Sequence, residues 1–206
     1  CASCGICSRA TSLSNAINAM YTPSERSRRV TQLLERPATA HAAADPLRPI
    51  WASMLAGRAL GEGVLPATLG LLPAEFQCLV ADYFPGTHCE CTSAASHAIE
   101  ELGDLFDLLV AHRAGQQPSE VWLARSVAWG CGGGDHLWQD LGLAHRGGLS
   151  FLMQTAFTSL AALNVHDMKW KKFIYRQYCS KEGLYVCPTP SCAECADFTN
   201  CYAPQE

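Results

Sequence analysis

The sequence is short of charge and contains no long hydrophobic run. Charged residues make up 17% of its 206 residues, and the formal net charge at pH 7 is −4. A general nucleic-acid binder depends on clustered lysine and arginine, so this balance argues against one. Pro66 and Pro73 interrupt the most apolar stretch, and no run of about eighteen apolar residues remains for a transmembrane helix. We therefore expect neither a nucleic-acid partner nor a membrane span.

Signatures of the common enzyme classes are missing as well. The chain contains no G-x-S-x-G of a serine hydrolase and no H-E-x-x-H of a zinc protease. The glycines at 132–134 are not followed by the lysine of a Walker phosphate-binding loop. No nucleophile and base can be paired by their spacing. We therefore do not expect an enzyme.

Cysteine, in contrast, is abundant. Seven of the twelve cysteines lie at the two ends of the chain, and Cys78, Cys131 and Cys179 lie singly in apolar helical patterns. A secreted disulfide scaffold would space its cysteines throughout, so this distribution favours a reducing cytoplasm and metal-bound thiolates. With 49% hydrophobic residues, the chain can bury the core of one domain and carry tails besides.

Helical periodicity dominates the middle of the chain. Apolar residues recur every three to four positions, and prolines and glycines separate the segments. The expected helices are a short basic one over 24–36, one around 51–58, one from 73 to the turn at 84–86, one over 93–113, one opened at 118–120, a short one with residues 136–140, and one from 167 to 182. We predict an all-α fold: a loosely ordered extension over 1–45 with a linker at 38–44, one helical domain over 46–183, and an irregular cysteine-rich metal-binding loop over 184–206.

The glycine run at 132–134 leads into one group of candidate residues. Asp135 can cap a new helix that carries His136 and Asp140. Because these two residues are four apart, they share one helix face and could coordinate or polarise a metal. A histidine beside glycines can equally be a hydrogen-bonded structural residue.

The last expected helix carries a second group. Asp167 is its predicted N-cap, and Lys169, Lys172 and Arg176 form a cationic stripe along one face. Such a stripe attracts an oxyanion or an acidic partner to the cysteines that follow, or is only a solvated surface. The sequence alone leaves both interpretations open.

The C-terminal tail is the densest chemical feature. Its cysteines have the spacing C-x4-C-x2-C-x5-C and are Cys187, Cys192, Cys195 and Cys201. Pro188 and Pro190 fix backbone torsions and remove N–H donors, so the segment is expected to be a loop. A short loop with four thiols can wrap around one metal centre.

Three interpretations of these thiols compete. Structural zinc is usually bound by two C-x2–4-C pairs separated by a longer arm, and this tail has one tight pair and two looser spacings. Disulfides require an oxidising compartment, for which nothing in the chain argues. The first three cysteines repeat the C-x4-C-x2-C order of plant-type iron–sulfur proteins, and the uneven spacing suits an object larger than one ion. Spacing therefore favours an iron–sulfur cluster over zinc or disulfides.

Three segments together resemble the nitrogen-fixation family NifQ. They are C-x4-H-L-W-Q-D-L-G-L at 131–143, D-M-K-W-K-K-F-I-Y-R at 167–176, and the cysteine tail. The resemblance implies an iron–sulfur protein, not an enzyme, that carries molybdenum toward assembly of the nitrogenase iron–molybdenum cofactor. It implies that the four tail cysteines hold the cluster, and that the partners are the NifEN scaffold and the nitrogenase iron protein NifH.

The residues fit such a carrier independently. Molybdate is a hard oxyanion, whereas reduced, sulfur-bound molybdenum requires soft ligands, which thiolates and cluster sulfides provide. Cys131 and His136 are further candidates for the molybdenum side, and Lys169, Lys172 and Arg176 for attracting anions or docking a partner. Two other functions remain open from the sequence: an iron–sulfur electron-transfer protein, and an interaction module stapled by zinc.

Overall fold

A computed structural model describes residues 24–87 and 102–182. Within these two ranges all regular secondary structure is helical, which confirms the predicted all-α class. The predicted cysteine-rich loop at 184–206 lies outside the described residues, as do 1–23 and 88–101. The helices are α2 (Glu25–Leu34), α3 (Ala40–Ala44), α4 (Arg48–Ala59), α5 (Pro73–Tyr83), α6 (Leu102–Ala111), α7 (Ser119–Cys131), α8 (Leu137–Asp140), α9 (Arg146–Ala156), α10 (Thr158–Leu163) and α11 (Trp170–Glu182).

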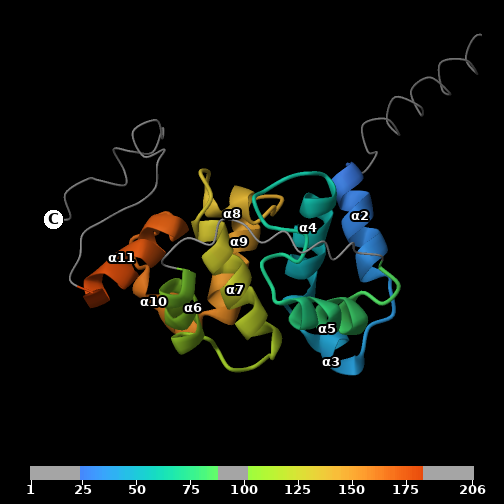
Figure 1. The fold of residues 1–206 in the computed structure, drawn as a ribbon, viewed down its shortest axis with the longest axis horizontal. Coiled ribbons are helices and arrows are strands. Elements are labelled where there is room, and N and C mark those ends of the chain that lie inside the picture. The colour runs from blue at the N-terminus through green and yellow to red at the C-terminus, as the bar shows by residue number, and fades with distance from the viewer. Residues whose placement is uncertain (1–23, 88–101, 183–206) are drawn as a thin grey trace, which may run out of the picture.

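Figure 1 shows the helices in two neighbouring groups, α2–α5 on one side and α6–α11 on the other. One hydrophobic core continues through both groups. Trp51 and Phe76 enter it from the first group, and Leu123 and Phe157 enter it from the second. Because all four side chains are almost completely buried in the same cluster, the described residues share a single core.

Two helices lie in the segment that we expected to be loosely organised: α2, which confirms the short basic helix predicted over 24–36, and α3. Ser24 caps α2 by accepting a hydrogen bond from a first-turn N–H, and α2 packs against α4. The Arg26 guanidinium donates to the carbonyls of Ser53 (3.2 Å) and Gly142 (2.9 Å). The alanine-rich segment, interpreted as a linker, forms α3 and buries Ala42 completely, because alanine favours helix and allows close packing. Residues 24–45 therefore pack onto the helical body, in contrast to the expectation of loose order.

Prolines and glycines mark helix ends where the sequence predicts them. Pro73 is the first residue of α5, whose last turn is followed by the expected turn with Gly86 at a φ of +75°. Pro118 immediately precedes α7, which ends at Cys131 where the glycine run begins. Pro118 and the glycine run therefore determine where α7 begins and ends. The glycine run that follows α7 lies at the surface of the helical body.

A buried carboxylate connects three of the helices. Asp45, before α4, accepts hydrogen bonds from the Tyr83 hydroxyl at the end of α5 and from the Ser119 hydroxyl at the start of α7, both at 2.6 Å. Its other oxygen accepts from the Leu47 N–H at 2.8 Å. Burial, together with the hydrogen bond to Asp45, raises the pKa of Tyr83, so the phenol stays protonated and donates. We call Asp45, Tyr83 and Ser119 the Asp45 cluster.

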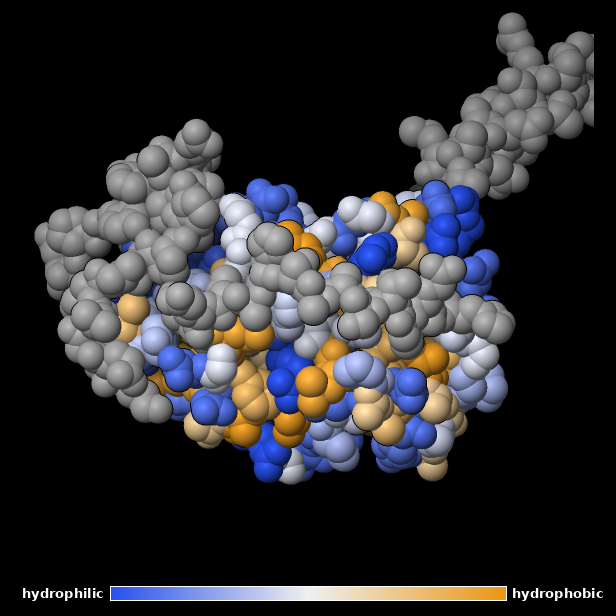
Figure 2. All heavy atoms as spheres, viewed as in Figure 1, coloured by the Kyte–Doolittle hydropathy of each residue, from blue (hydrophilic) through white to orange (hydrophobic). Residues whose placement is uncertain are grey.

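Apolar side chains also reach the surface. Figure 2 shows hydrophobic and hydrophilic residues interspersed over the visible face. The large exposed hydrophobic residues come from separate segments: Val64, Leu72, Phe151, Leu163 and Val165. Single exposed apolar residues are usual in folded proteins and do not by themselves mark a binding surface. None of the helices in the described ranges is both long enough and apolar enough to cross a membrane.

Candidate functional site

The four predicted cluster ligands follow the last helix of the described chain. Cys187, Cys192, Cys195 and Cys201 lie outside the described residues, so their arrangement is not part of the structure. What the structure does place is α11, the helix that leads into this tail, together with the glycine loop, which we define as residues 132–136.

One face of α11 is firmly buried. Phe173 and Ile174 are in the core, and the Trp170 ring meets Phe173 edge-on with ring centroids 6.0 Å apart. The helix packs against α6, where the Tyr178 hydroxyl donates to the Asp104 carboxylate at 3.1 Å. The predicted apolar face of this helix therefore does bury its large side chains, and the start of the tail is attached to a well-packed helix.

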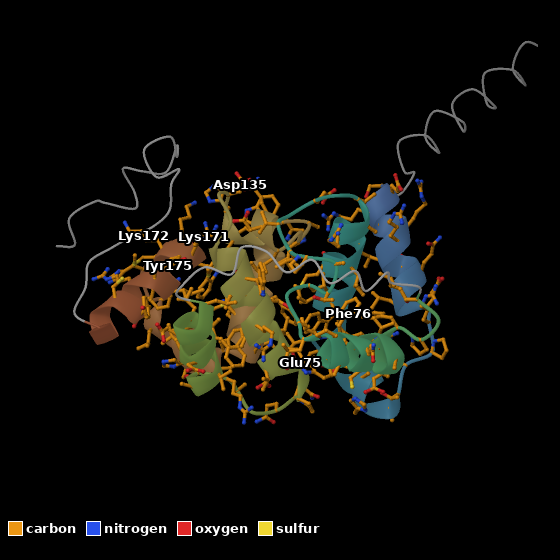
Figure 3. The ribbon with its side chains drawn as sticks, viewed as in Figure 1. Glu75, Phe76, Asp135, Lys171, Lys172 and Tyr175 are labelled. Carbon is orange, nitrogen blue, oxygen red and sulfur yellow. The ribbon has the colours of Figure 1, made fainter. Side chains whose placement is uncertain are left out.

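Lys171, also on α11, forms a buried ion pair with Asp140. The Lys171 side chain is 5% exposed and the Asp140 side chain 1%. The ammonium group also donates to the main-chain carbonyls of Gly133 (3.0 Å) and Asp135 (2.7 Å), both in the glycine loop. We call Lys171, Asp140 and these two carbonyls the Lys171 cluster. Figure 3 labels two of its residues, Lys171 on α11 and Asp135 in the glycine loop. The Lys171 cluster connects the first turn of α11 to the glycine loop and to the end of α8.

The glycine loop is closed around the same carboxylate. The Asp135 N–H donates to Asp140, 3.2 Å from the nearer oxygen. The glycine at 133 is required by space, because a Cβ there would run into the Asp140 carboxylate, whereas a Cβ on Gly134 would meet nothing within 4 Å. The loop is thus connected to the Asp140 carboxylate in two ways. Its Gly133 and Asp135 carbonyls bind the Lys171 ammonium that pairs with Asp140, and its Asp135 N–H binds the carboxylate directly.

Cys131, a candidate for the molybdenum side, is buried at the end of α7. Its exposed fraction is 3%. Burial raises the pKa of the Cys131 thiol to about 12, although the nearby Lys171 ammonium acts in the opposite direction. Metal ligation uses the thiolate, so in this arrangement Cys131 is a protonated core residue. Its main-chain carbonyl accepts a long hydrogen bond, 3.4 Å, from the Tyr175 hydroxyl of α11.

His136, the other candidate, is exposed at the start of α8. It, and not Asp135 as predicted, occupies the N-cap position of this short helix, and its N–H donates to the Gln139 side chain at 3.3 Å. The predicted sharing of one helix face by His136 and Asp140 does not occur, because Asp140 is buried and paired with Lys171 whereas His136 is exposed. His136 therefore remains an accessible imidazole beside the loop, without Asp140 as a partner ligand.

The cationic stripe lies on α11 and on the segment before it. Lys169, Lys172 and Arg176 are each partly exposed, and Arg176 lies 3.5 Å from the Met168 sulfur. Asp167 is not the N-cap that we predicted: it has a φ of +48°, and its carboxylate pairs with Arg146 at 2.8 Å. The stripe stays compatible with anion attraction, but its helix begins later than Asp167.

Within residues 24–87 and 102–182, no three His, Cys, Asp or Glu side chains come together in a way that could hold a metal ion. The predicted metal centre was assigned to the tail, which lies beyond these ranges, so that prediction remains open.

Lys171 and Asp140 are the residues that sequence reasoning missed as a pair. The helical spacing could have indicated that Lys171 is buried. Ile174 and Tyr175 follow it by three and four residues, so they share its helix face, and both are buried. A lysine on the buried face of an amphipathic helix requires a partner. Its partner, however, lies 31 positions earlier in the sequence, and no local pattern connects the two.

Comparisons with known proteins agree on one family. The family model described as NifQ matches residues 50–203. The protein NifQ of Azotobacter vinelandii is 38% identical over 160 residues, which cover 70% of this chain and 82% of that protein. NifQ of Rhodobacter capsulatus is 36% identical, covering 78% and 90%, and NifQ of Klebsiella pneumoniae is 33% identical, covering 77% and 97%. No solved structure matches the chain.

Fold and site together define an all-helical protein in which a buried lysine ties a glycine loop to the helix that precedes a cysteine-rich tail. The match to the family model spans most of the chain, and it includes both the glycine loop and all four tail cysteines. The chain belongs to the NifQ family, which confirms the resemblance seen in the sequence.

Proposed function

We propose that this chain is an iron–sulfur protein that carries molybdenum for assembly of the nitrogenase iron–molybdenum cofactor. Membership of the NifQ family supports a role in nitrogen fixation. The observation that carries the finer proposal is the extent of the family match, which reaches residue 203 and so takes in the whole C-x4-C-x2-C-x5-C spacing. All four tail cysteines thus lie within the region that matches the family model.

The donor set fits the proposed cofactor. Four cysteines within fifteen residues supply soft thiolate ligands, which suit iron–sulfur clusters. A bound cluster would supply sulfide ligands for reduced molybdenum, which is the cargo. Cys187, Cys192, Cys195 and Cys201 would hold the cluster, and the packed helix α11 would fix the point from which the tail begins. A reducing compartment such as the cytoplasm keeps such thiols available.

The partners follow from the same family. We propose that the NifEN scaffold and the iron protein NifH receive or process the cargo, with molybdate or a molybdenum–sulfur species as its source. Lys169, Lys172 and Arg176 are the proposed docking or anion-attracting residues, because they give a cationic surface to the helix that leads into the tail.

Metal analysis of the anaerobically purified chain tests this function. In the unsubstituted protein we expect iron, acid-labile sulfide and molybdenum, and replacement of all four tail cysteines by serine should remove all three. Cys78→Ser is the matched control, because Cys78 is an exposed cysteine on α5, and it should leave the metals unchanged.

Three results would contradict the proposal. Iron and molybdenum that persist in the fourfold variant would place the centre elsewhere. Zinc in place of iron, in a colourless protein, would favour an interaction module. Iron and sulfide that undergo one-electron cycling, with no molybdenum bound under any condition, would favour electron transfer.

A further inference from the structure

We propose that the turn between α10 and α11 docks this chain on the protein that receives its cargo, and that this partner offers an apolar pocket edged by carboxylates. We define the α10–α11 turn as residues 163–168. This docking role rests on the proposed function for the identity of the partner, whereas the residues that form the surface all lie in the described part of the chain. It favours an acidic protein over a free oxyanion as the ligand of the cationic stripe.

The α10–α11 turn exposes two apolar side chains close together. Val165 is 75% exposed and Leu163 is 53% exposed, and only one residue separates them. An exposed valine adds little to the stability of the chain that carries it, but burial of the same side chain against a partner removes apolar surface from water. The favourable free energy of these two side chains is therefore gained only when another molecule covers them.

Hydrogen bonds hold the turn in one conformation. The Asn164 side chain donates to the Met168 carbonyl at 3.0 Å and accepts from the Met168 N–H at 2.9 Å. The Asp167 N–H donates to the Asn164 carbonyl at 3.2 Å. Val165 lies inside this closed turn, so a partner does not have to order the segment when it binds, and less conformational entropy is lost.

The turn is also attached to α9. Asp167 has a φ of +48°, a left-handed conformation that non-glycine residues rarely adopt, and its carboxylate pairs with Arg146 at 2.8 Å. Just after the turn, the Trp170 indole N–H donates to the Ser150 hydroxyl at 3.4 Å. These contacts fix the turn relative to the helical body, as a surface that recognises a partner requires.

Cationic groups border the turn and indicate the charge of the partner. Lys169 follows the turn directly, and the Arg176 guanidinium lies 3.5 Å from the Met168 sulfur. Arg146 pairs with Asp167, which is the only acidic residue among 163–168. Carboxylates of a partner complement this border, whereas a small oxyanion would gain nothing from the exposed apolar side chains. An apolar centre with a charged rim is the usual composition of a protein interface.

Binding of the full chain to purified NifEN and to purified NifH, each measured by biolayer interferometry, tests this surface. Val165→Ser removes the apolar contact, so we expect about tenfold weaker binding to the partner that recognises the turn. Val165→Asp removes the same contact and adds repulsion from the partner's carboxylates, so binding should weaken by about 100-fold. Val165→Lys also removes the contact but adds attraction, so its loss should be smaller than that of Val165→Asp.

Asn164→Ala tests whether the closed turn matters. It removes both side-chain bonds to Met168 and leaves Val165 in place. We expect amide hydrogen exchange at Met168 to accelerate by about tenfold and binding to weaken by about threefold to tenfold. Unchanged exchange and unchanged binding would show that the turn is not held by Asn164 and would overturn its preorganisation.

Val64→Asp is the matched control, because Val64 is an exposed valine in a different segment, and it should leave binding unchanged. Iron and molybdenum per chain should be the same in every variant and in the unsubstituted chain. This second readout separates docking from the proposed cargo function.

Several results would overturn the docking role. Equal weakening by Val64→Asp and Val165→Asp would mean that the turn is not recognised, and a larger loss in Val165→Lys than in Val165→Asp would indicate a basic partner. A dimer of the unsubstituted chain that Val165→Asp dissociates would make a second copy the occupant. Failure of a chain that holds iron and molybdenum to bind either protein would overturn the docking role and leave the proposed function standing. Absence of both metals from the unsubstituted chain would overturn the proposed function, and the binding series would still decide whether the turn docks a protein.

Discussion

Two of the buried carboxylates in the described residues, Asp45 and Asp140, have different kinds of partners. Asp45 accepts hydrogen bonds from two neutral hydroxyls, those of Tyr83 and Ser119, and joins the ends of three helices. Asp140 is paired with the Lys171 ammonium, and the two together hold the main chain of a loop. One cluster fixes how helices meet, and the other fixes the conformation of a segment without regular structure.

The two clusters therefore have different structural roles: the Asp45 cluster joins helix ends, and the Lys171 cluster holds the main chain of the glycine loop. Where helix ends meet, neutral hydroxyls are sufficient partners for the Asp45 carboxylate, because the helices already position them. The glycine loop has no such support, so its carbonyls depend on a donor that comes from another element. An ammonium group supplies three donors at one point, which no neutral side chain does.

The largest difference should appear when each carboxylate loses one partner. Lys171→Met should lower the free energy of unfolding by about 3–5 kcal/mol, because it leaves an unpaired buried charge. Tyr83→Phe should lower it by about 1.5–3 kcal/mol, because Asp45 keeps its bonds to Ser119 and Leu47. Chemical denaturation of both variants measures the difference. Equal losses would mean that the charged partner of Asp140 contributes no more to the free energy of unfolding than a neutral partner of Asp45.

A smaller effect should separate the two central glycines of the loop. Gly133→Ala brings a methyl group against the Asp140 carboxylate, so we expect a loss of about 1–3 kcal/mol in the free energy of unfolding. Gly134→Ala meets no neighbouring atom and should change it by less than about 1 kcal/mol. Thermal or chemical unfolding compares the two directly. If both variants lose the same amount, Asp140 does not pack against the loop as described.

Local sequence signals predicted most of the helices in the described ranges but not the contacts between them. The starts of α5 and α7 follow from Pro73 and Pro118, and the end of α7 follows from the glycine run, because these residues act within one turn. The fold class followed from the same signals. The helices α9 and α10 were not predicted.

The two wrong N-cap predictions have a common cause. Asp135 and Asp167 have the side chain of a good N-cap, and both were predicted as caps from residue type alone. In the structure Asp135 lies one residue too early, and its N–H binds Asp140, while Asp167 pairs with Arg146. Partners distant in the sequence decided both positions. The same holds for Lys171, whose burial depends on Asp140 and on loop carbonyls more than thirty positions away.

The smallest effect concerns two cysteines: Cys78, exposed on α5, and Cys131, buried at the end of α7. In peptide-resolved alkylation at pH 8, Cys78 should react in the folded protein because it is exposed, whereas buried Cys131 should react only when the protein unfolds. Burial raises the pKa of Cys131 to about 12, so the folded state keeps its proton at a pH where the unfolded chain loses it. Stability should therefore fall as the pH rises above about 8.5, by up to about 1.4 kcal/mol per unit, and Cys131→Ala should remove this contribution. Equal alkylation of the two thiols in the folded protein would show that Cys131 is accessible, and would return it to the molybdenum side of the site beside His136.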